Sequence, residues 1–148
     1  MDSPAPLGSY LTPSLEHATA GDVMRPRVLT CTPDTPLVTV AQRMASEHVH
    51  ALVVLAPGGD VAVERYPWAI LTDRELLRNA ERADETTAGE VASTDVLQVA
   101  PGDALSDVAR RMVDRHVTHA VVVDGRTRRP VGVVSTLDIA GVVGWGRG

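Results

Sequence analysis

The sequence predicts a mixed α/β (α+β) fold that consists of two tandem β-α-β-β-α repeats. One observation is that residues 20–23 recur 68 positions later as residues 88–91, and further matches follow at this offset. A second is that the offset falls to 63 where residues 70–72 match residues 133–135, so the first repeat carries a five-residue insertion. Such an insertion fits a loop better than a helix or a strand. Since the pattern occurs only twice, we expect two units that bury their faces against each other about a pseudo-twofold axis.

The elements of the first repeat follow from its apolar patterns and its breakers. A short apolar strand ends at Pro33, because proline removes a backbone donor. The next segment has apolar residues at i, i+3, i+4 and i+7, which is the spacing of a helical stripe. A continuously apolar run then predicts a strand buried on both faces, and residues 57–60 break it. The predicted elements are strands at 28–31, 51–55 and 68–71 and helices from Pro36 and at 73–82.

The second repeat has the same order of elements. A strand at 96–99 precedes a helix from Ala104 to about Arg115, which carries the same apolar stripe. Two strands, 119–123 and 131–134, form a hairpin through an Asp-Gly turn. A last helix begins near Thr136 and ends before the glycine-rich segment 141–148. The expected organisation is a loosely ordered arm at 1–18, repeats at 19–82 and 88–142, a linker at 83–87 and a tail at 143–148.

Composition narrows the class of protein. The chain has 148 residues and a formal net charge of -5, which argues against broad binding to nucleic acid or to an anionic membrane. No apolar run approaches the roughly 20 residues that span a bilayer, and the N-terminus lacks a signal-peptide pattern. With Cys31 as the single cysteine, the cytoplasm is the simplest location. The chain has no lysine and no recognisable catalytic arrangement, so we do not expect an enzyme.

Each repeat ends with a strand that runs through a hydroxyl residue into a helix, with an acid three positions later. The pairs are Thr72 with Glu75 and Ser135 with Asp138. The unpaired N–H groups and the helix dipole at such a start suit a phosphate. The acid lies one turn further on, where it can accept hydrogen bonds from the vicinal diol of a ribose. The same spacing is also a capping box, in which the two side chains only satisfy the helix end, and both interpretations stay open.

An ordered set of motifs resembles the CBS domain, named for cystathionine β-synthase, whose tandem pairs are called Bateman modules. The set comprises Asp22-Val23-Met24 before a strand and Thr32-Pro33-Asp34, a helix that ends in Met-x3-His-Val, and the Ser/Thr-x-x-Asp/Glu exit. It occurs twice and covers about residues 20–141.

This resemblance implies that the chain binds an adenosyl ligand in the cleft between the repeats. The ligand would be an adenine nucleotide (AMP, ADP or ATP) or S-adenosylmethionine. In the family pattern the hydroxyl residue and the helix start contact phosphate, the acid contacts ribose, and the strands line the cleft near the base. The implied site residues in this chain are Ser135, Thr136, Asp138, Gly132 and His119 in the second repeat and Thr72 and Glu75 in the first.

The two copies of the site are not equivalent. Thr72 retains the hydroxyl, but Glu75 replaces Asp, and Ala69 stands where Gly132 stands in the second copy. Gly132 would let a ligand approach the backbone. The longer side chain of Glu75 would displace its carboxylate by about an ångström from the ribose position. The second copy is therefore the favoured site.

These inferences predict a regulatory module that signals by a conformational change to a regulated protein, which the sequence does not identify. We expect a homodimer. The alternative is a dimerisation or partner-docking scaffold that binds no ligand. Histidines near the helix ends raise the further question of a metal, but no carboxylate or cysteine completes a ligand set, so no metal is expected. These histidines are His48, His50, His116 and His119.

Overall fold

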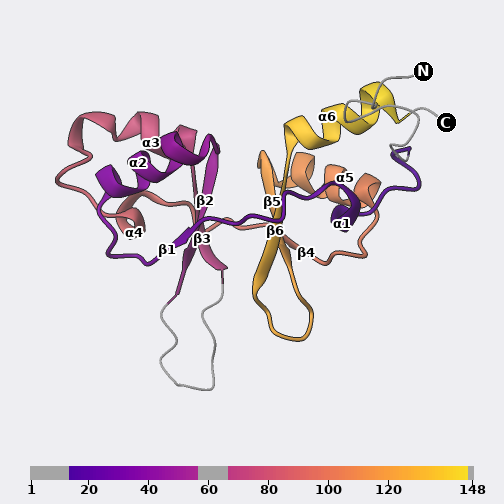
Figure 1. The fold of residues 1–148 in the computed structure, drawn as a ribbon, viewed down its shortest axis with the longest axis horizontal. Coiled ribbons are helices and arrows are strands. Elements are labelled where there is room, and N and C mark those ends of the chain that lie inside the picture. The colour runs from indigo at the N-terminus through magenta and orange to yellow at the C-terminus, as the bar shows by residue number, and fades with distance from the viewer. Residues whose placement is uncertain (1–13, 57–66, 147–148) are drawn as a thin grey trace. The chain divides into compact units, whose positions relative to one another are not determined.

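The computed structural model describes residues 14–56 and 67–146 and confirms the mixed α/β fold (Figure 1). Each repeat contributes one three-stranded sheet. The first repeat contains α1 (Ala20–Val23), β1 (Thr30–Cys31), α2 (Leu37–Glu47), β2 (Ala51–Leu55), β3 (Pro67–Thr72), α3 (Asp73–Arg78) and the 3-10 helix η1 (Ala80–Arg82). The second contains α4 (Ala88–Val91), β4 (Gln98–Val99), α5 (Leu105–Arg115), β5 (His119–Val123), β6 (Pro130–Ser135) and α6 (Thr136–Trp145). The break expected at 57–60 and residues 1–13 of the arm lie outside the described residues.

Both sheets have the same topology. Their strand orders are β1-β2-β3 and β4-β5-β6. The short first strand runs parallel to the middle strand in each, and β2 and β3 are antiparallel. The strands predicted at 28–31 and 96–99 are shorter than expected, since regular pairing covers only two residues of each. A two-residue strand at a sheet edge leaves little backbone for pairing with another chain.

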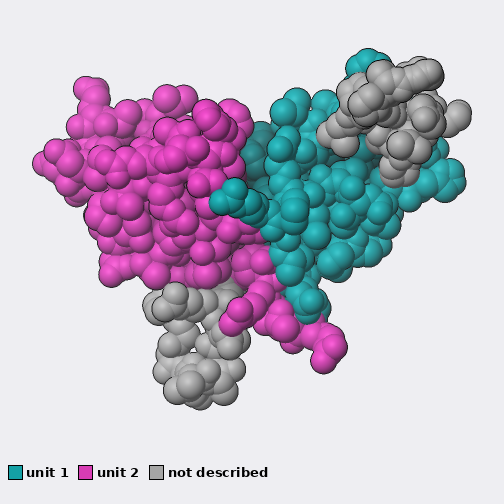
Figure 2. Space-filling model, in the orientation of Figure 1, with its two compact units in different colours: residues 1–27, 97–125, 131–148 teal, residues 28–96, 126–130 magenta. Residues whose placement is uncertain are grey.

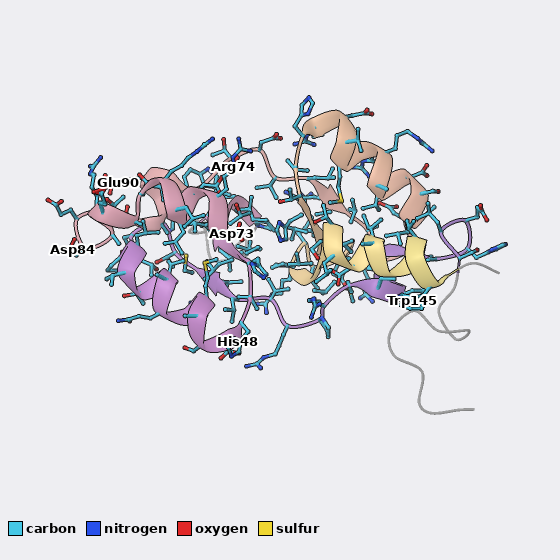
Figure 3. All side chains as sticks on the ribbon, turned by 90° about the horizontal axis from the view of Figure 1, so that it is seen from above. His48, Asp73, Arg74, Asp84, Glu90 and Trp145 are labelled. Carbon is cyan, nitrogen blue, oxygen red and sulfur yellow. The ribbon has the colours of Figure 1, made fainter. Side chains whose placement is uncertain are left out.

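The helices differ from the prediction at their ends. Each repeat begins with a four-residue helix, α1 or α4, that apolar periodicity did not indicate. The helix predicted at 73–82 is divided into α3 and η1. The last helix was expected to end before Gly141, but α6 continues to Trp145 (Figure 3). Burial of Val142 in the core outweighs the low helix propensity of the glycines, and the N–H of Gly146 caps the helix on the Val142 carbonyl. None of the described helices has the length and hydrophobicity that a membrane span needs.

The two compact units of the chain do not coincide with the two sequence repeats (Figure 2). Unit 1 combines residues 1–27 with 97–125 and 131–148, and unit 2 combines 28–96 with 126–130. Helix α1 therefore belongs with the second repeat and α4 with the first.

Matched hydrogen bonds hold the exchanged helices. In unit 1 the N–H of Gly21 donates to the Pro101 carbonyl at 2.8 Å, and in unit 2 the N–H of Gly89 donates to the Pro33 carbonyl at 2.8 Å. Ala20 and Ala88, one on each short helix, are fully buried in the cores of these units. Each core is thus completed by a segment from the other repeat.

Part of the arm that was expected to be loosely ordered is packed. Residues 14–18 form a turn in which the N–H groups of His17 and Ala18 donate to the Ser14 carbonyl. Ala18 is buried in the unit 1 core, and its carbonyl accepts the N–H of Leu105 at 2.9 Å. Side-chain burial and a backbone bond fix this segment, although it shows no apolar periodicity.

Candidate functional site

The exit of the second repeat is a well-formed helix start. Ser135 ends β6 in extended conformation and is the N-cap of the ten-residue helix α6. Its hydroxyl accepts the N–H of Asp138 at 3.3 Å, while the Asp138 carboxylate accepts the N–H of Ser135 at 2.8 Å and its hydroxyl at 3.0 Å. The N–H of Thr136 donates to the carbonyl of Thr118, the residue before β5. The start of α6 is therefore tied to the start of the neighbouring strand.

Capping boxes of this kind recur along the chain. Among the described residues the four pairs are Thr19 with Asp22, Thr72 with Glu75, Thr87 with Glu90, and Ser135 with Asp138. In the pair that caps α4, the acid Glu90 is exposed, and hydrogen bonds from Thr87 lower its pKa. Capping geometry alone therefore does not distinguish a ligand site in this protein. Both interpretations of the exit motif remain compatible with these contacts.

Asp138 differs from the other capping acids in its burial and in its partner. Its side chain is only 3% exposed, and its Oδ1 lies 3.3 Å from Nε of Arg25, whose side chain is 63% exposed. Its Oδ2 holds both contacts to Ser135. A buried carboxylate is costly unless it is paired and hydrogen-bonded, and here each oxygen has a protein partner. This carboxylate is the most constrained charge of the candidate site.

Arg25 is positioned by the backbone of β6. Its N–H donates to the Val133 carbonyl at 2.9 Å, and its carbonyl accepts the N–H of Val133 at 3.1 Å. The preceding residue, Met24, fills the space beside Gly132, where an added Cβ would overlap Sδ and lie 2.8 Å from Cγ of Met24. In this structure the room left by Gly132 is thus taken by a side chain of the same chain. Sequence reasoning used Met24 as a motif residue and missed Arg25 altogether.

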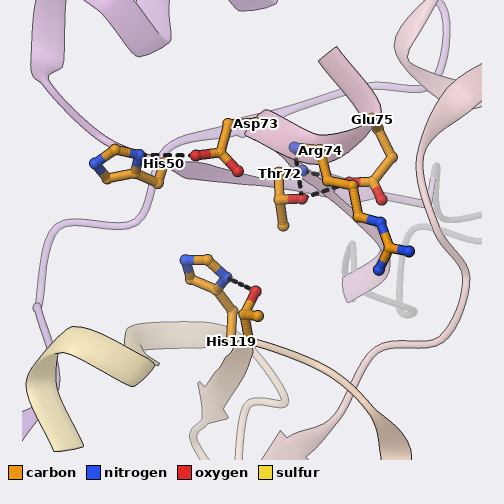
Figure 4. A network of polar contacts seen from close by, with 7 residues as sticks. His50, Thr72, Asp73, Arg74, Glu75 and His119 are labelled. Atoms are coloured by element: carbon orange, nitrogen blue, oxygen red, sulfur yellow. Dashed lines mark hydrogen bonds and ion pairs between the residues drawn. The ribbon is translucent and has the colours of Figure 1, made fainter. Parts of the chain in front are cut away.

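The exit of the first repeat repeats the cap without the cation. The Glu75 carboxylate accepts the N–H and the hydroxyl of Thr72, both at 2.7 Å, and the N–H of Arg74 donates to the Thr72 hydroxyl at 3.2 Å (Figure 4). Ser93, the counterpart of Arg25 at the repeat offset, makes the matching backbone bridge to Ile70 at 2.8 Å. A serine cannot supply the charge that Arg25 gives to Asp138. Helix α3 is also shorter than α6, with six residues.

The histidines of the two repeats have different partners. His119 opens β5, is half-buried, and its Nδ1 lies 2.9 Å from the Thr118 hydroxyl. His50 lies just before β2, and its Nδ1 is 3.0 Å from Oδ2 of Asp73 (Figure 4). His48 and His116 occupy left-handed positions at the ends of α2 and α5. Within residues 14–56 and 67–146, no group of three or more potential ligands is arranged to hold a metal ion.

Of the predicted site residues, unit 1 contains Ser135, Thr136, Asp138, Gly132 and His119, and unit 2 contains Thr72 and Glu75. Contacts join Ser135 to Asp138 and the Thr136 backbone to the residue beside His119. Whether any of them binds a ligand stays a prediction.

Comparison with known proteins gives a consistent family and fold. The model of the CBS domain matches residues 20–82 and again 88–144. A homoserine O-acetyltransferase of Methanohalophilus mahii is 30% identical over 140 residues, which are 95% of this chain. The chain spans only 27% of that protein's length, so the enzyme's name says nothing about the activity of this segment.

Two solved structures share the fold at low sequence identity. The CBS domain pair of protein MJ0100, in complex with 5′-methylthioadenosine and S-adenosyl-L-methionine, has a TM-score of 0.74 and 18% identity, and the match covers 88% of this chain and 98% of that one. A CBS domain protein of Pyrobaculum aerophilum, complexed with AMP, has a TM-score of 0.68 and 22% identity, with 81% and 88% covered.

Proposed function

The chain belongs to the CBS domain family, with two domains in tandem, and we propose that it is a regulatory module that reversibly binds an adenosyl ligand at the exit of the second repeat. The observation that carries this proposal is Asp138, a buried carboxylate one turn inside a ten-residue helix that begins at a hydroxyl residue. The structural neighbours in complex with AMP and with S-adenosyl-L-methionine support the ligand class.

Each part of the ligand would meet a different chemical group. The Ser135 hydroxyl would contact an anionic phosphate at the positive end of the α6 dipole, where the N–H groups of Thr136 and Asp138 already have acceptors in the protein. Asp138 would accept the ribose hydroxyls, which every adenosyl ligand carries. His119 would line the base end, and Gly132 would do so only where the Met24 side chain moves from the space beside it. Asp138 would thus bind the ribose, which AMP, ADP, ATP and S-adenosylmethionine have in common. Ser135 would favour the ligands that carry a phosphate over those that do not.

The corresponding position of the first repeat would bind more weakly. Glu75 already directs one oxygen to Thr72, and α3 is a shorter helix with a weaker dipole. Ligand binding at the second exit would favour one conformation of the module, and a regulated protein would respond to that change.

The test is a calorimetric titration with AMP, ATP, S-adenosylmethionine and NAD. A ligand at 100 times its Kd adds about 2.7 kcal/mol to the stability, so a thermal-shift panel selects the best one first. Asp138→Ala removes charge-assisted bonds worth about 1.5–3 kcal/mol each, so the affinity should fall at least about tenfold.

Two variants separate loss of ligand contacts from loss of a helix cap. Asp22→Ala removes the capping acid of α1 in the same unit, and Glu75→Ala removes that of α3. Asp22→Ala should bind nearly as the wild type does, and Glu75→Ala should weaken binding less than Asp138→Ala does. No heat with any adenosyl compound, or equal affinity for wild type and Asp138→Ala, would remove the ligand assignment.

The competing candidate is a dimerisation or docking scaffold, and exposed apolar side chains on the helices favour it. They include Leu77 on α3, Val113 on α5, and Leu137, Val143 and Trp145 on α6. Exposed apolar side chains mark a surface that meets a partner where they are contiguous, and α6 alone carries three of them. We propose a homodimer as the partner that covers them, and dimerisation is compatible with ligand binding.

A further inference from the structure

We propose that Arg25 acts as a latch on the adenosyl site, by which we mean a side chain that competes with the ligand. Its guanidinium pairs with the Asp138 carboxylate in the ligand-free protein, and a ribose must displace it to bind. This inference rests on the proposed function. It is carried by the 3.3 Å contact between Arg25 Nε and Asp138 Oδ1 and by the burial of that carboxylate.

The two partners of the ion pair differ in their freedom to move. Asp138 is held at Oδ2 by the N–H and the hydroxyl of Ser135, and its side chain is 3% exposed. Arg25 is fixed only through its backbone, by two hydrogen bonds to Val133. Its side chain is 63% exposed, so the guanidinium can swing into water while the carboxylate stays in place. Breaking the ion pair therefore requires only the Arg25 side chain to move.

The acceptor capacity of Asp138 makes arginine and ribose compete. A carboxylate has about four lone-pair positions, and the Oδ2 pair is used by Ser135. The vicinal diol of a ribose needs two acceptor positions, and Arg25 occupies one of those left on Oδ1. Without ligand, loss of the guanidinium would leave a buried charge without a cation, which is unfavourable. The empty site is therefore stabilised in its closed form.

Met24 helps to fix the position of the Arg25 backbone beside β6. Its side chain packs into the space beside Gly132, directly before Arg25. At the exit of the first repeat the corresponding residues are Ala92 and Ser93, which supply neither the bulk nor the charge. The latch is thus a property of the second exit alone.

The size of the effect follows from the strength of the ion pair. An ion pair with one exposed partner is weak, so it is formed in only part of the protein molecules. The apparent affinity for the ligand is the intrinsic affinity multiplied by the fraction of molecules in which the pair is broken. Arg25→Ala should therefore bind adenosine about two- to sixfold more tightly than the wild type. The direction is opposite to that of any loss of structure.

The experiment measures adenosine binding by calorimetry for the wild type, Arg25→Ala, Arg25→Gln and a control. Adenosine carries no phosphate, so a change in net charge does not confuse the result. Arg110→Ala is the matched control, because Arg110 is 66% exposed and pairs with Asp107 at 2.9 Å, but that acid is on the surface. The glutamine variant keeps most of the side chain if alanine proves unstable in a thermal melt.

A second ligand tests the role of the diol. The gain in affinity should vanish with 2′,3′-dideoxyadenosine, which does not compete for Asp138. Tighter binding of adenosine by both Arg25 variants, with no gain for the dideoxy ligand or for Arg110→Ala, supports the latch.

Other outcomes divide the two proposals. Equal or weaker adenosine binding by both Arg25 variants, with a wild type that binds, overturns the latch and leaves the adenosyl site standing. An equal gain for the dideoxy ligand also overturns it, since competition at Asp138 would not be the cause. If neither the wild type nor the variants bind any adenosyl compound, both proposals fall.

Discussion

Replacing Gly89 with alanine tests the exchange of short helices between the repeats. A Cβ on Gly89 would lie 2.8 Å from Cβ and 2.9 Å from O of Pro33. These atoms belong to a proline ring and a backbone carbonyl, which cannot rotate away, so α4 would have to shift and strain its 2.8 Å bond to Pro33. Overpacking of this kind costs about 1–3 kcal/mol, and the strained hydrogen bond adds about 0.5–1.5 kcal/mol. The better helix propensity of alanine returns about 1 kcal/mol. We expect a net loss of about 0.5–3.5 kcal/mol.

The repeat offers its own graded controls for this substitution. At Gly21 the nearest atom to an added Cβ is the Pro101 carbonyl oxygen at 3.1 Å, so Gly21→Ala should cost less than about 1 kcal/mol. At Gly102 nothing lies within 4 Å, and Gly102→Ala should be nearly neutral. Stability therefore should fall in the order Gly102→Ala, Gly21→Ala, Gly89→Ala.

Urea denaturation followed by tryptophan fluorescence measures this order. The chain has two tryptophans, Trp68 in β3 of unit 2 and Trp145 at the end of α6 in unit 1. A Trp145→Phe background leaves Trp68 to report on the unit that contains Gly89. Wild-type stability for Gly89→Ala, or a larger loss for Gly21→Ala, would refute the packing of α4 on the Pro33 loop.

Three further predictions concern the core, the cysteine and the assembly. Gly132→Ala should lose about 1–3 kcal/mol of unfolding free energy, because the Met24 side chain beside it must move. Gly144→Ala, where an added Cβ meets nothing within 4 Å, should gain up to about 1 kcal/mol from the better helix propensity of alanine. Equal denaturation midpoints for the two variants would contradict this. Burial raises the pKa of the Cys31 thiol above its ordinary value of 9.0, so native protein should react slowly with iodoacetamide at pH 8. The unfolded chain loses this proton first, so the thiol's contribution to stability is complete below pH 9.0 and falls as the pH rises further, and Cys31→Ala should flatten that part of the stability profile. Light scattering at micromolar concentration should give about twice 15.7 kDa, and a monomer mass would exclude the dimer but not the ligand site.

Local sequence patterns were sufficient for most of the elements. Apolar periodicity located α2 and α5, and continuous apolar runs located β2 and β5. The hydroxyl residue with an acid three positions later located the starts of α3 and α6. Such signals depend on residues within one or two turns of each other, so they survive without knowledge of the rest of the chain. The C-terminal end of α6 and the starts of the two short edge strands were missed, because burial and pairing with distant segments set them.

The repeat offset also identified matched residues whose roles it could not assign. Arg43 and Arg111 correspond at the offset of 68. In the structure the guanidinium of Arg43 donates to the Thr30 carbonyl at 2.5 Å, and that of Arg111 donates to the Gln98 carbonyl at 3.1 Å. Each arginine thus ties the long helix to the short first strand of its own sheet. The equivalence is visible in the sequence, but the acceptor is a backbone atom that every residue carries.

The sequence by itself determined the family, the two sheets and the helix start that forms the proposed ligand site. Tertiary structure alone decided which repeat each short helix completes, because both copies carry the same glycine and the same proline, and the pattern cannot tell one partner from the other. The tertiary structure also decided the burial and the ion pairing of Asp138. That carboxylate and Arg25 are 113 positions apart in the sequence, and only folding brings an exposed guanidinium against a buried acid. Burial and long-range pairing set the charge balance of the site, and neither is encoded in spacing along the chain.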